Sequence, residues 1–137
     1  MDIIKKNNNI NKAKSLYKDI YGVEKGIIEL NLSDFTYKNK ILSINQNKGL
    51  IIFYAPWCKY CKKISDLLIK LALSNINLFN IYAVNAENLE GGNDYVCTYA
   101  GIKEFPTLKY ILEDGTLKDY EYEYTQDNLI YFINMNI

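Results

Sequence analysis

A pair of cysteines three residues apart stands where one kind of secondary structure gives way to another. The run from Gly49 to Ala55 is continuously apolar and rich in branched and aromatic residues, which predicts a strand covered on both faces in a parallel sheet. From Cys58 to Leu73 the apolar positions recur at helical spacing, which predicts an amphipathic helix. Cys58 and Cys61 are therefore expected on one side of the first helical turn, at the carboxyl end of a buried strand.

This position favours chemistry at the first cysteine. Backbone N–H groups without partners and the positive end of the helix dipole stabilise a thiolate at Cys58, and Lys59 adds positive charge. We expect Cys58 to be the nucleophile that attacks a disulfide, and Cys61 to resolve the mixed disulfide by closing a Cys58–Cys61 disulfide. A structural disulfide, or a metal or iron–sulfur site shared between chains, is the alternative use of the pair.

Composition removes several other classes of function. The 137 residues include no His, and all 16 basic residues are Lys. Without His there is no Ser–His or Cys–His catalytic pair and no zinc site with imidazole ligands. Three Cys cannot supply a four-thiolate site in a monomer, so we expect neither a metal nor a cofactor. The third, Cys97, is expected to be a buried inert thiol, with regulatory oxidation or an intermolecular disulfide as the alternative.

Charge and hydropathy bear on partners and location. The 16 Lys balance 16 Asp and Glu, which leaves no net charge to hold nucleic acid or an anionic membrane surface. No apolar run approaches the roughly 18 residues that a membrane span needs, and the first residues are not signal-like. We expect a monomeric cytoplasmic protein, with packaging in a virion as the alternative location.

The chain reads as a single α/β domain at residues 23–137, preceded by a polar extension at 1–22 that is partly helical over Asn11–Ile20. The pattern predicts a mixed sheet of four or five strands flanked by helices. Further strands are expected at Gly26–Leu32, Leu78–Val84, Thr107–Leu112 and Leu117–Tyr124, the last two joined by a turn at Asp114-Gly115. Further helices are expected from Ser33 or Asp34 to about Gln46, as a short piece closed by Gly101, and from Asp127 to Met135, with Leu129, Ile130, Phe132 and Ile133 facing the sheet.

Two stretches resemble landmarks of the thioredoxin superfamily. Phe53-Tyr54-Ala55-Pro56-Trp57-Cys58 is similar to the active-site entry of protein disulfide isomerase domains, and Gly101 to Thr107 is similar to the segment that carries a cis-proline facing the active cysteines. The resemblance covers about Gly26 to Ile137 and implies a thioredoxin fold. It also implies a cofactor-free thiol–disulfide oxidoreductase that acts on protein disulfides or dithiols and exchanges electrons with an upstream redox partner.

The same resemblance implies where substrate binds. Pro106 is expected to be cis, and Phe105 would offer backbone groups to an extended peptide that adds as a strand. Trp57 completes the expected substrate-binding residues.

The sequence departs from the family where the resolving cysteine needs a base. Six residues before the first cysteine, thioredoxins have a buried Asp and disulfide isomerases a Glu, but this chain has Ile52. The Lys that commonly accompanies that acid aligns with Ala83, and the Arg of disulfide isomerases cannot occur in an Arg-free chain. We therefore predict a slower resolving step than in typical members.

The dipeptide between the cysteines leaves the direction of the reaction open. Lys59-Tyr60 replaces the Gly-Pro of thioredoxins and the Gly-His of disulfide isomerases, and potentials span roughly −270 to −120 mV across related proteins. Lys59 either tunes the thiolate or is a solvated charge, and Tyr60 either packs or contacts substrate. The rival function is a binding module whose disulfide is structural and whose groove beside Pro106 holds a partner without turnover.

Overall fold

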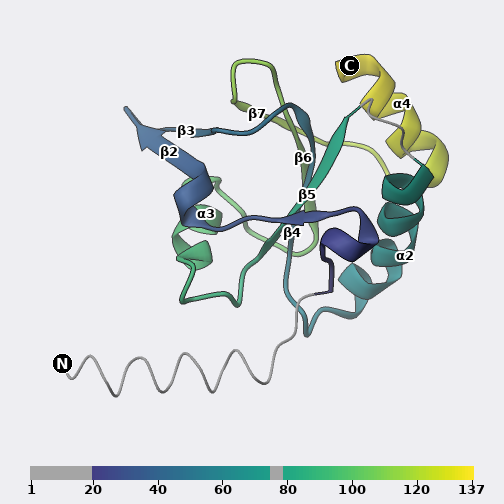
Figure 1. The fold of residues 1–137 in the computed structure, drawn as a ribbon, viewed down its shortest axis with the longest axis horizontal. Helices are drawn as coiled ribbons and strands as arrows, with labels where there is room; N and C mark the ends of the chain where they lie inside the picture. Colours follow the sequence, from purple (N-terminus) through teal and green to yellow (C-terminus); the bar gives the residue numbers. More distant parts are fainter. Residues whose placement is uncertain (1–19, 75–78) are drawn as a thin grey trace.

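The computed structural model describes residues 20–74 and 79–137, and a five-stranded mixed sheet lies at its centre (Figure 1). The strand order is β1-β5-β4-β6-β7, with β1 and β4 parallel to β5, β6 antiparallel to β4 and β7 antiparallel to β6. The predicted mixed sheet is thereby confirmed. Its strands are β1 (Ile28–Glu29), β4 (Gly49–Tyr54), β5 (Asn80–Asn85), β6 (Thr107–Ile111) and β7 (Leu117–Asp119).

The sheet separates two layers of covering elements. Helices α2 (Lys59–Ser74) and α4 (Gln126–Asn136) cover one face, while α3 (Asn93–Tyr99) and a hairpin of β2 (Phe35–Lys38) and β3 (Ile41–Ile44) lie over the other (Figure 1). All six residues of the central strand β4 are buried, because its alternating side chains enter a core on each face. This arrangement confirms the prediction of a strand covered on both sides.

The β4–α2–β5 crossover determines where the cysteines lie. Strand β4 ends at Tyr54, α2 begins at Lys59, and β5 returns parallel to β4. The first turn of α2 therefore lies at the carboxyl end of the central strand, as the change in periodicity predicts. Parts of two expectations, the helix before Ile20 and the start of a strand at Leu78, lie outside the described residues.

The helix expected from Ser33 to Gln46 is wrong. A capping box does form here: the Asn31 side chain accepts from the Ser33 N–H, and the Asp34 carboxylate accepts from the Asn31 N–H. This capping box starts only a 3-10 turn at Leu32–Asp34 and no α-helix. The hairpin follows, reversing at Asn39 and Lys40, which both have positive φ of 53° and 62°. The strand expected at Gly26–Leu32 is likewise short, since only Ile28–Glu29 pairs with β5 and a 3-10 turn at Val23–Lys25 precedes it.

The strand expected at Leu117–Tyr124 stops at Asp119. Beyond it, aromatic rings pack together: Tyr120 stacks on Tyr124, with ring centres 5.6 Å apart, and meets Phe132 edge-on at 4.9 Å. Helix α4 buries Leu129, Phe132 and Ile133 as predicted. Ile130, expected to face the sheet, is 38% exposed because it points away from that stripe.

Candidate active site

Cys58 caps the helix that follows it. Its carbonyl accepts the first helical hydrogen bond, from the Lys62 N–H at 3.3 Å, and its Sγ accepts from the Cys61 N–H at 3.2 Å. A cap side chain that accepts from the third helical residue normally satisfies one of the orphan N–H groups of the first turn, and here sulfur does so. A negative charge on Sγ would strengthen that bond.

The two cysteines differ in their access to solvent. Both are free thiols in this structure; the Cys58 side chain is 7% exposed and Cys61 is fully buried. Burial, and secondarily a hydrogen bond with the Cys58 side chain, raise the pKa of the Cys61 thiol to about 12. Cys61 is therefore protonated at neutral pH and needs a base before it can act as a nucleophile.

A cis-proline loop forms the wall opposite Cys58. The Phe105–Pro106 bond is cis, in agreement with the resemblance, and the Phe105 carbonyl accepts from Cys58 Sγ at 3.5 Å. The Tyr124 hydroxyl donates to the Pro106 carbonyl at 3.0 Å, which ties the loop to the segment before α4. The structure thus brings residues from two distant parts of the chain to one sulfur atom.

Aromatic side chains flank this wall on both sides. Trp57, 57% exposed, meets the Phe105 ring edge-on at 6.2 Å and donates from Nε1 to the Glu87 carboxylate at 2.7 Å. Tyr60, 49% exposed, lies 5.8 Å from the Tyr124 ring. These exposed rings beside Cys58 are available to a bound polypeptide.

The remaining predicted residues fall in two groups. Lys59 is exposed at the start of α2, so its assignment to thiolate tuning stays a prediction. Cys97 is buried in the core on the opposite face of the sheet from Cys58, and burial raises its pKa to about 12, with the nearby Asp94 charge contributing. Its burial agrees with the expectation, and its inertness stays a prediction.

Sequence reasoning missed two residues at the site. Glu87 orients Trp57, and its backbone N–H is held by the Asn85 side chain at 2.9 Å, but a loop glutamate carries no sequence signal for such a role. Tyr124, which the sequence places at the end of a strand, instead holds the cis-proline loop through its hydroxyl.

The missing acid leaves an apolar pair in the sheet. Ile52 is fully buried and lies opposite Ala83 in the β4–β5 register. The two positions at which the family resemblance expects an acid and a lysine are therefore both occupied by aliphatic side chains. Strand β4 contains no carboxylate that could serve as a base for Cys61.

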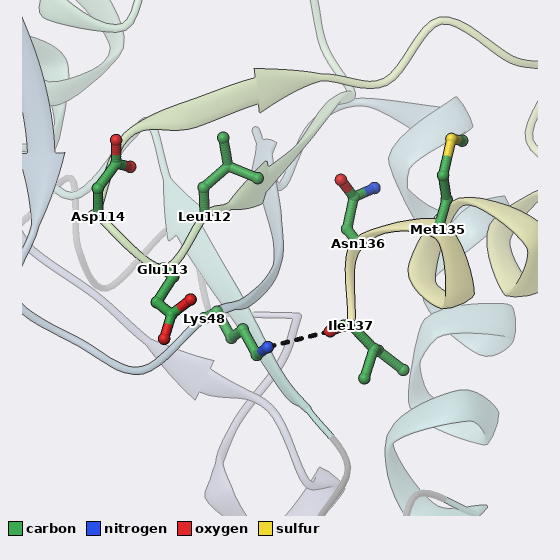
Figure 2. A pocket seen from close by; sticks show the side chains of 7 residues that line it. All are labelled: Lys48, Leu112, Glu113, Asp114, Met135, Asn136 and Ile137. Carbon is green, nitrogen blue, oxygen red and sulfur yellow. Dashed lines mark hydrogen bonds between the residues drawn. The ribbon is translucent and has the colours of Figure 1, made fainter.

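A separate depression lies at the opposite end of β4 from the cysteines. Figure 2 shows it between Lys48, Glu113, Asp114 and the end of α4, where Lys48 Nζ donates to the Ile137 carbonyl at 3.2 Å. Since β4 runs from this depression toward Cys58, the two cannot form one site.

Comparison with known proteins now decides the family. The thioredoxin family profile matches residues 28–135. The chain belongs to the thioredoxin family. Its relatives include protein disulfide isomerases, and Cys58 and Cys61 are separated by two residues at the start of α2.

Two curated relatives show how far the similarity extends. A mitochondrial thioredoxin domain-containing protein of Schizosaccharomyces pombe is 34% identical over 69% of this chain and 24% of its own length. A protein disulfide-isomerase of Datisca glomerata is 32% identical over 64% of this chain and 17% of its own length. This thioredoxin-family chain thus spans a quarter or less of the length of these relatives.

Solved structures agree on the fold. The J-Trx1 fragment of ERdj5 superposes with a TM-score of 0.63 at 20% identity, covering 80% of this chain and 49% of that one. The first thioredoxin domain of mouse protein disulfide-isomerase A4 gives a TM-score of 0.56 at 20% identity, covering 74% and 78%. In the described parts of this family member, no helix is long and apolar enough to cross a membrane.

Proposed function

We propose that this protein exchanges its Cys58–Cys61 dithiol or disulfide with cysteines of protein substrates. The observation that carries the proposal is the cap geometry: Cys58 Sγ accepts from the Cys61 N–H at 3.2 Å and lies 3.5 Å from the Phe105 carbonyl oxygen. That geometry joins an activated sulfur to a second thiol one helical turn away.

In the reducing direction the reaction has two steps. The Cys58 thiolate attacks one sulfur of a substrate disulfide, forming a mixed disulfide and releasing the other substrate sulfur as a thiolate that takes up a proton. The Cys61 thiolate then attacks Cys58 Sγ, and the bond between Cys58 and the substrate breaks. The substrate has gained two electrons, and the protein holds a Cys58–Cys61 disulfide that a redox partner must reduce. The reverse sequence oxidises a substrate dithiol.

The substrate segment is proposed to bind in extended form along the cis-proline loop. Phe105 and Pro106 flank Cys58, so a peptide that pairs with this backbone presents its sulfur to the nucleophile. Trp57 would cover one side of that segment, since its exposed ring is already fixed by Glu87 and Phe105. Tyr60 lies on the other side, beside Tyr124.

Trapping of the mixed disulfide tests this function. Replacing Cys61 by Ser removes the resolving thiol, so we expect disulfide-linked client proteins to accumulate and to be released by dithiothreitol. Cys58→Ser is the matched control and should trap none. If a folded Cys61→Ser protein formed no mixed disulfide with a peptide disulfide in excess, the proposed activity would be wrong.

A non-catalytic binding module is the second candidate. The Ile52–Ala83 pair favours it, because a thiol as deeply buried as Cys61 has no acid beside it on β4 to accept its proton. Such a module would bind peptide at the Pro106 loop equally well after both cysteines are replaced by Ser, whereas the exchange mechanism requires Cys58.

A further inference from the structure

A row of five tyrosine rings leads away from the candidate active site. It begins at Tyr60, between the two cysteines, whose ring centre lies 5.8 Å from that of Tyr124. Tyr124 stacks on Tyr120 at 5.6 Å. Tyr120 in turn lies 5.5 Å from Tyr122, which meets Tyr131 on α4 edge-on at 5.9 Å. These five residues, here called the tyrosine track, are continuous with the surface at which substrate is proposed to bind.

The outer rings of the track are exposed and held in place. Tyr122 and Tyr131 are 42% and 60% exposed. The buried Phe132 ring of α4 supports them, since it meets Tyr120 at 4.9 Å and Tyr122 at 6.1 Å. Aromatic side chains that are already fixed lose little conformational freedom when a partner covers them.

A second depression joins the cis-proline loop to the track. Its volume is about 470 Å³, and its lining includes Glu104 and Thr107, on either side of the Phe105–Pro106 bond, and Tyr120 of the track. The Thr107 hydroxyl donates to the Glu104 carbonyl at 2.7 Å, and the Tyr120 N–H donates to the Leu108 carbonyl at 3.2 Å. A client chain that leaves the cis-proline loop therefore meets a preformed hollow on the way to the track.

Carboxylates surround the track. Residues 119–137 contain four acidic side chains and no basic one, and all four acids are exposed: Asp119, Glu121, Glu123 and Asp127. Glu104, in the lining of the depression, is exposed as well. Within the described parts of the chain, Glu104, Glu121 and Glu123 form no ion pair. These charges are therefore available to a partner.

The basic groups nearby do not balance these acids. Lys109 is paired with Asp119 at 2.6 Å, and Lys103 lines the depression. The Lys118 ammonium lies 5.9 Å from the centre of the Phe132 ring. Three lysines thus stand against five carboxylates, in a chain whose total charge is zero. Lys118 also shows that this aromatic cluster accommodates an ammonium group against a ring.

We propose that the tyrosine track binds a lysine- or arginine-rich segment of the substrate protein, close in sequence to the cysteine that reacts with Cys58. Cations of that segment lie over the exposed rings of Tyr122 and Tyr131 and pair with Glu121 and Glu123. This inference rests on the proposed function and names its substrate class, disulfides flanked by basic residues. Each step between rings is close to two residues of extended chain, so the basic residues are expected about five to seven residues from the reactive cysteine.

Rates of mixed-disulfide formation with two peptides test this selection. Each peptide has one cysteine, activated as its disulfide with 5-thio-2-nitrobenzoate, whose release is followed by its colour. One peptide has lysines about five to seven residues from the cysteine on both sides, and the other has glutamines there. With Cys61→Ser protein at low ionic strength, we expect the lysine peptide to react at least about fivefold faster.

Surface variants assign the preference to the track. Glu121→Gln combined with Glu123→Gln should abolish it, and Tyr122→Leu, which keeps an apolar cover over Phe132, should reduce it. Glu113→Gln combined with Asp114→Asn is the matched control, because it removes the same charge in the depression at the opposite end of β4 from the cysteines. This control should keep the preference, and the glutamine peptide should react at one rate with all these proteins.

Three results would overturn the inference. The first is equal rates with the two peptides, and the second is a preference that survives the loss of the Glu121 and Glu123 charges or disappears equally in the control. The third is a dimer of this chain that dissociates in the Glu121→Gln, Glu123→Gln variant, measured by sedimentation, since a second copy would then occupy the track. If neither peptide released its leaving group, the proposed function would be contradicted, and this selection of substrates with it.

Discussion

At the scale of single residues, position and not chemical identity distinguishes the three cysteines. Cys58 Sγ caps a helix, whereas burial raises the pKa of both Cys61 and Cys97 to about 12. A thiol with such a pKa is ionised to about one part in 10⁵ at pH 7, and only the thiolate reacts readily.

Alkylation of the reduced protein should therefore be selective. With iodoacetamide at pH 7, we expect Cys58 to react at least ~100-fold faster than Cys61 or Cys97. Peptide mapping by mass spectrometry at timed intervals measures the three rates. Equal rates at Cys58 and Cys61 in the folded protein would contradict the cap assignment.

Restoring the missing acid should speed the resolving step. A carboxylate placed by Ile52→Asp in the core cluster that contains Cys61 offers a base that β4 otherwise lacks. Burying it should also destabilise the protein by about 2 kcal/mol or more, which urea unfolding would measure. A resolution rate no higher than that of the wild type, in quench-flow measurements on the folded variant, would refute the link between Ile52 and slow resolution.

The site residues that could be predicted from the sequence are those that belong to a short motif of neighbouring residues. Cys58, Cys61 and Pro106 belong to short motifs, so their positions could be read directly. Glu87 could not, because its contact with Trp57 joins loops 30 residues apart and nothing in either loop encodes the other.

At the scale of elements, the hairpin β2–β3 shows how a correct local signal can mislead. The capping interactions at Asn31 and Asp34 start one turn, after which Phe35 and Ile44 pair as strand ends and bury their side chains against the sheet. Tertiary packing of this kind outweighs helix propensity, and the turn that enables it contains no Gly to announce it. The longer helices α2 and α4 could be predicted because their apolar stripes persist over several turns.

The turn of this hairpin offers a stability test. Lys40 adopts φ of 62°, where a side chain is strained and glycine is not, so Lys40→Gly should stabilise the protein by about 1 kcal/mol. Lys38→Gly is the matched control in the exposed part of β2 and should destabilise it by roughly 0.5 to 1 kcal/mol. Denaturant unfolding measures both. The same loss of stability in both variants would indicate a regular helix or strand at Lys40 and not a turn.

At the scale of the whole molecule, β4 joins two cores, and Cys58 and Cys61 both belong to the core on the α2 face. Alternation along β4 directs Ile52 and Tyr54 to that face and Phe53 to the other. The layered architecture could be predicted because a strand–helix–strand connection between parallel strands is nearly always right-handed. The register that places Ala83 opposite both Ile52 and Glu29 could not, because register between strands depends on the completed fold.

The buried thiols also predict how global stability depends on pH. A folded-state pKa raised from about 9 to about 12 means that the folded protein resists ionisation of Cys61 and Cys97, so their contribution is complete below pH 9 and is lost as pH rises toward 12. Oxidation removes the Cys61 thiol from this titration. We expect the dithiol form to lose more unfolding free energy between pH 9 and 11 than the disulfide form, measured by urea unfolding of both; equal losses would contradict the assignment to Cys61.

The reduction potential of the cysteine pair tests the account most directly. The protein is equilibrated with glutathione buffers of known potential, and the redox state is followed by thiol labelling and by the fluorescence of Trp57, the one tryptophan in the chain. A pair that exchanges with substrates should titrate between roughly −270 and −120 mV. A pair that stays oxidised below about −300 mV would be a structural disulfide and would contradict catalytic exchange.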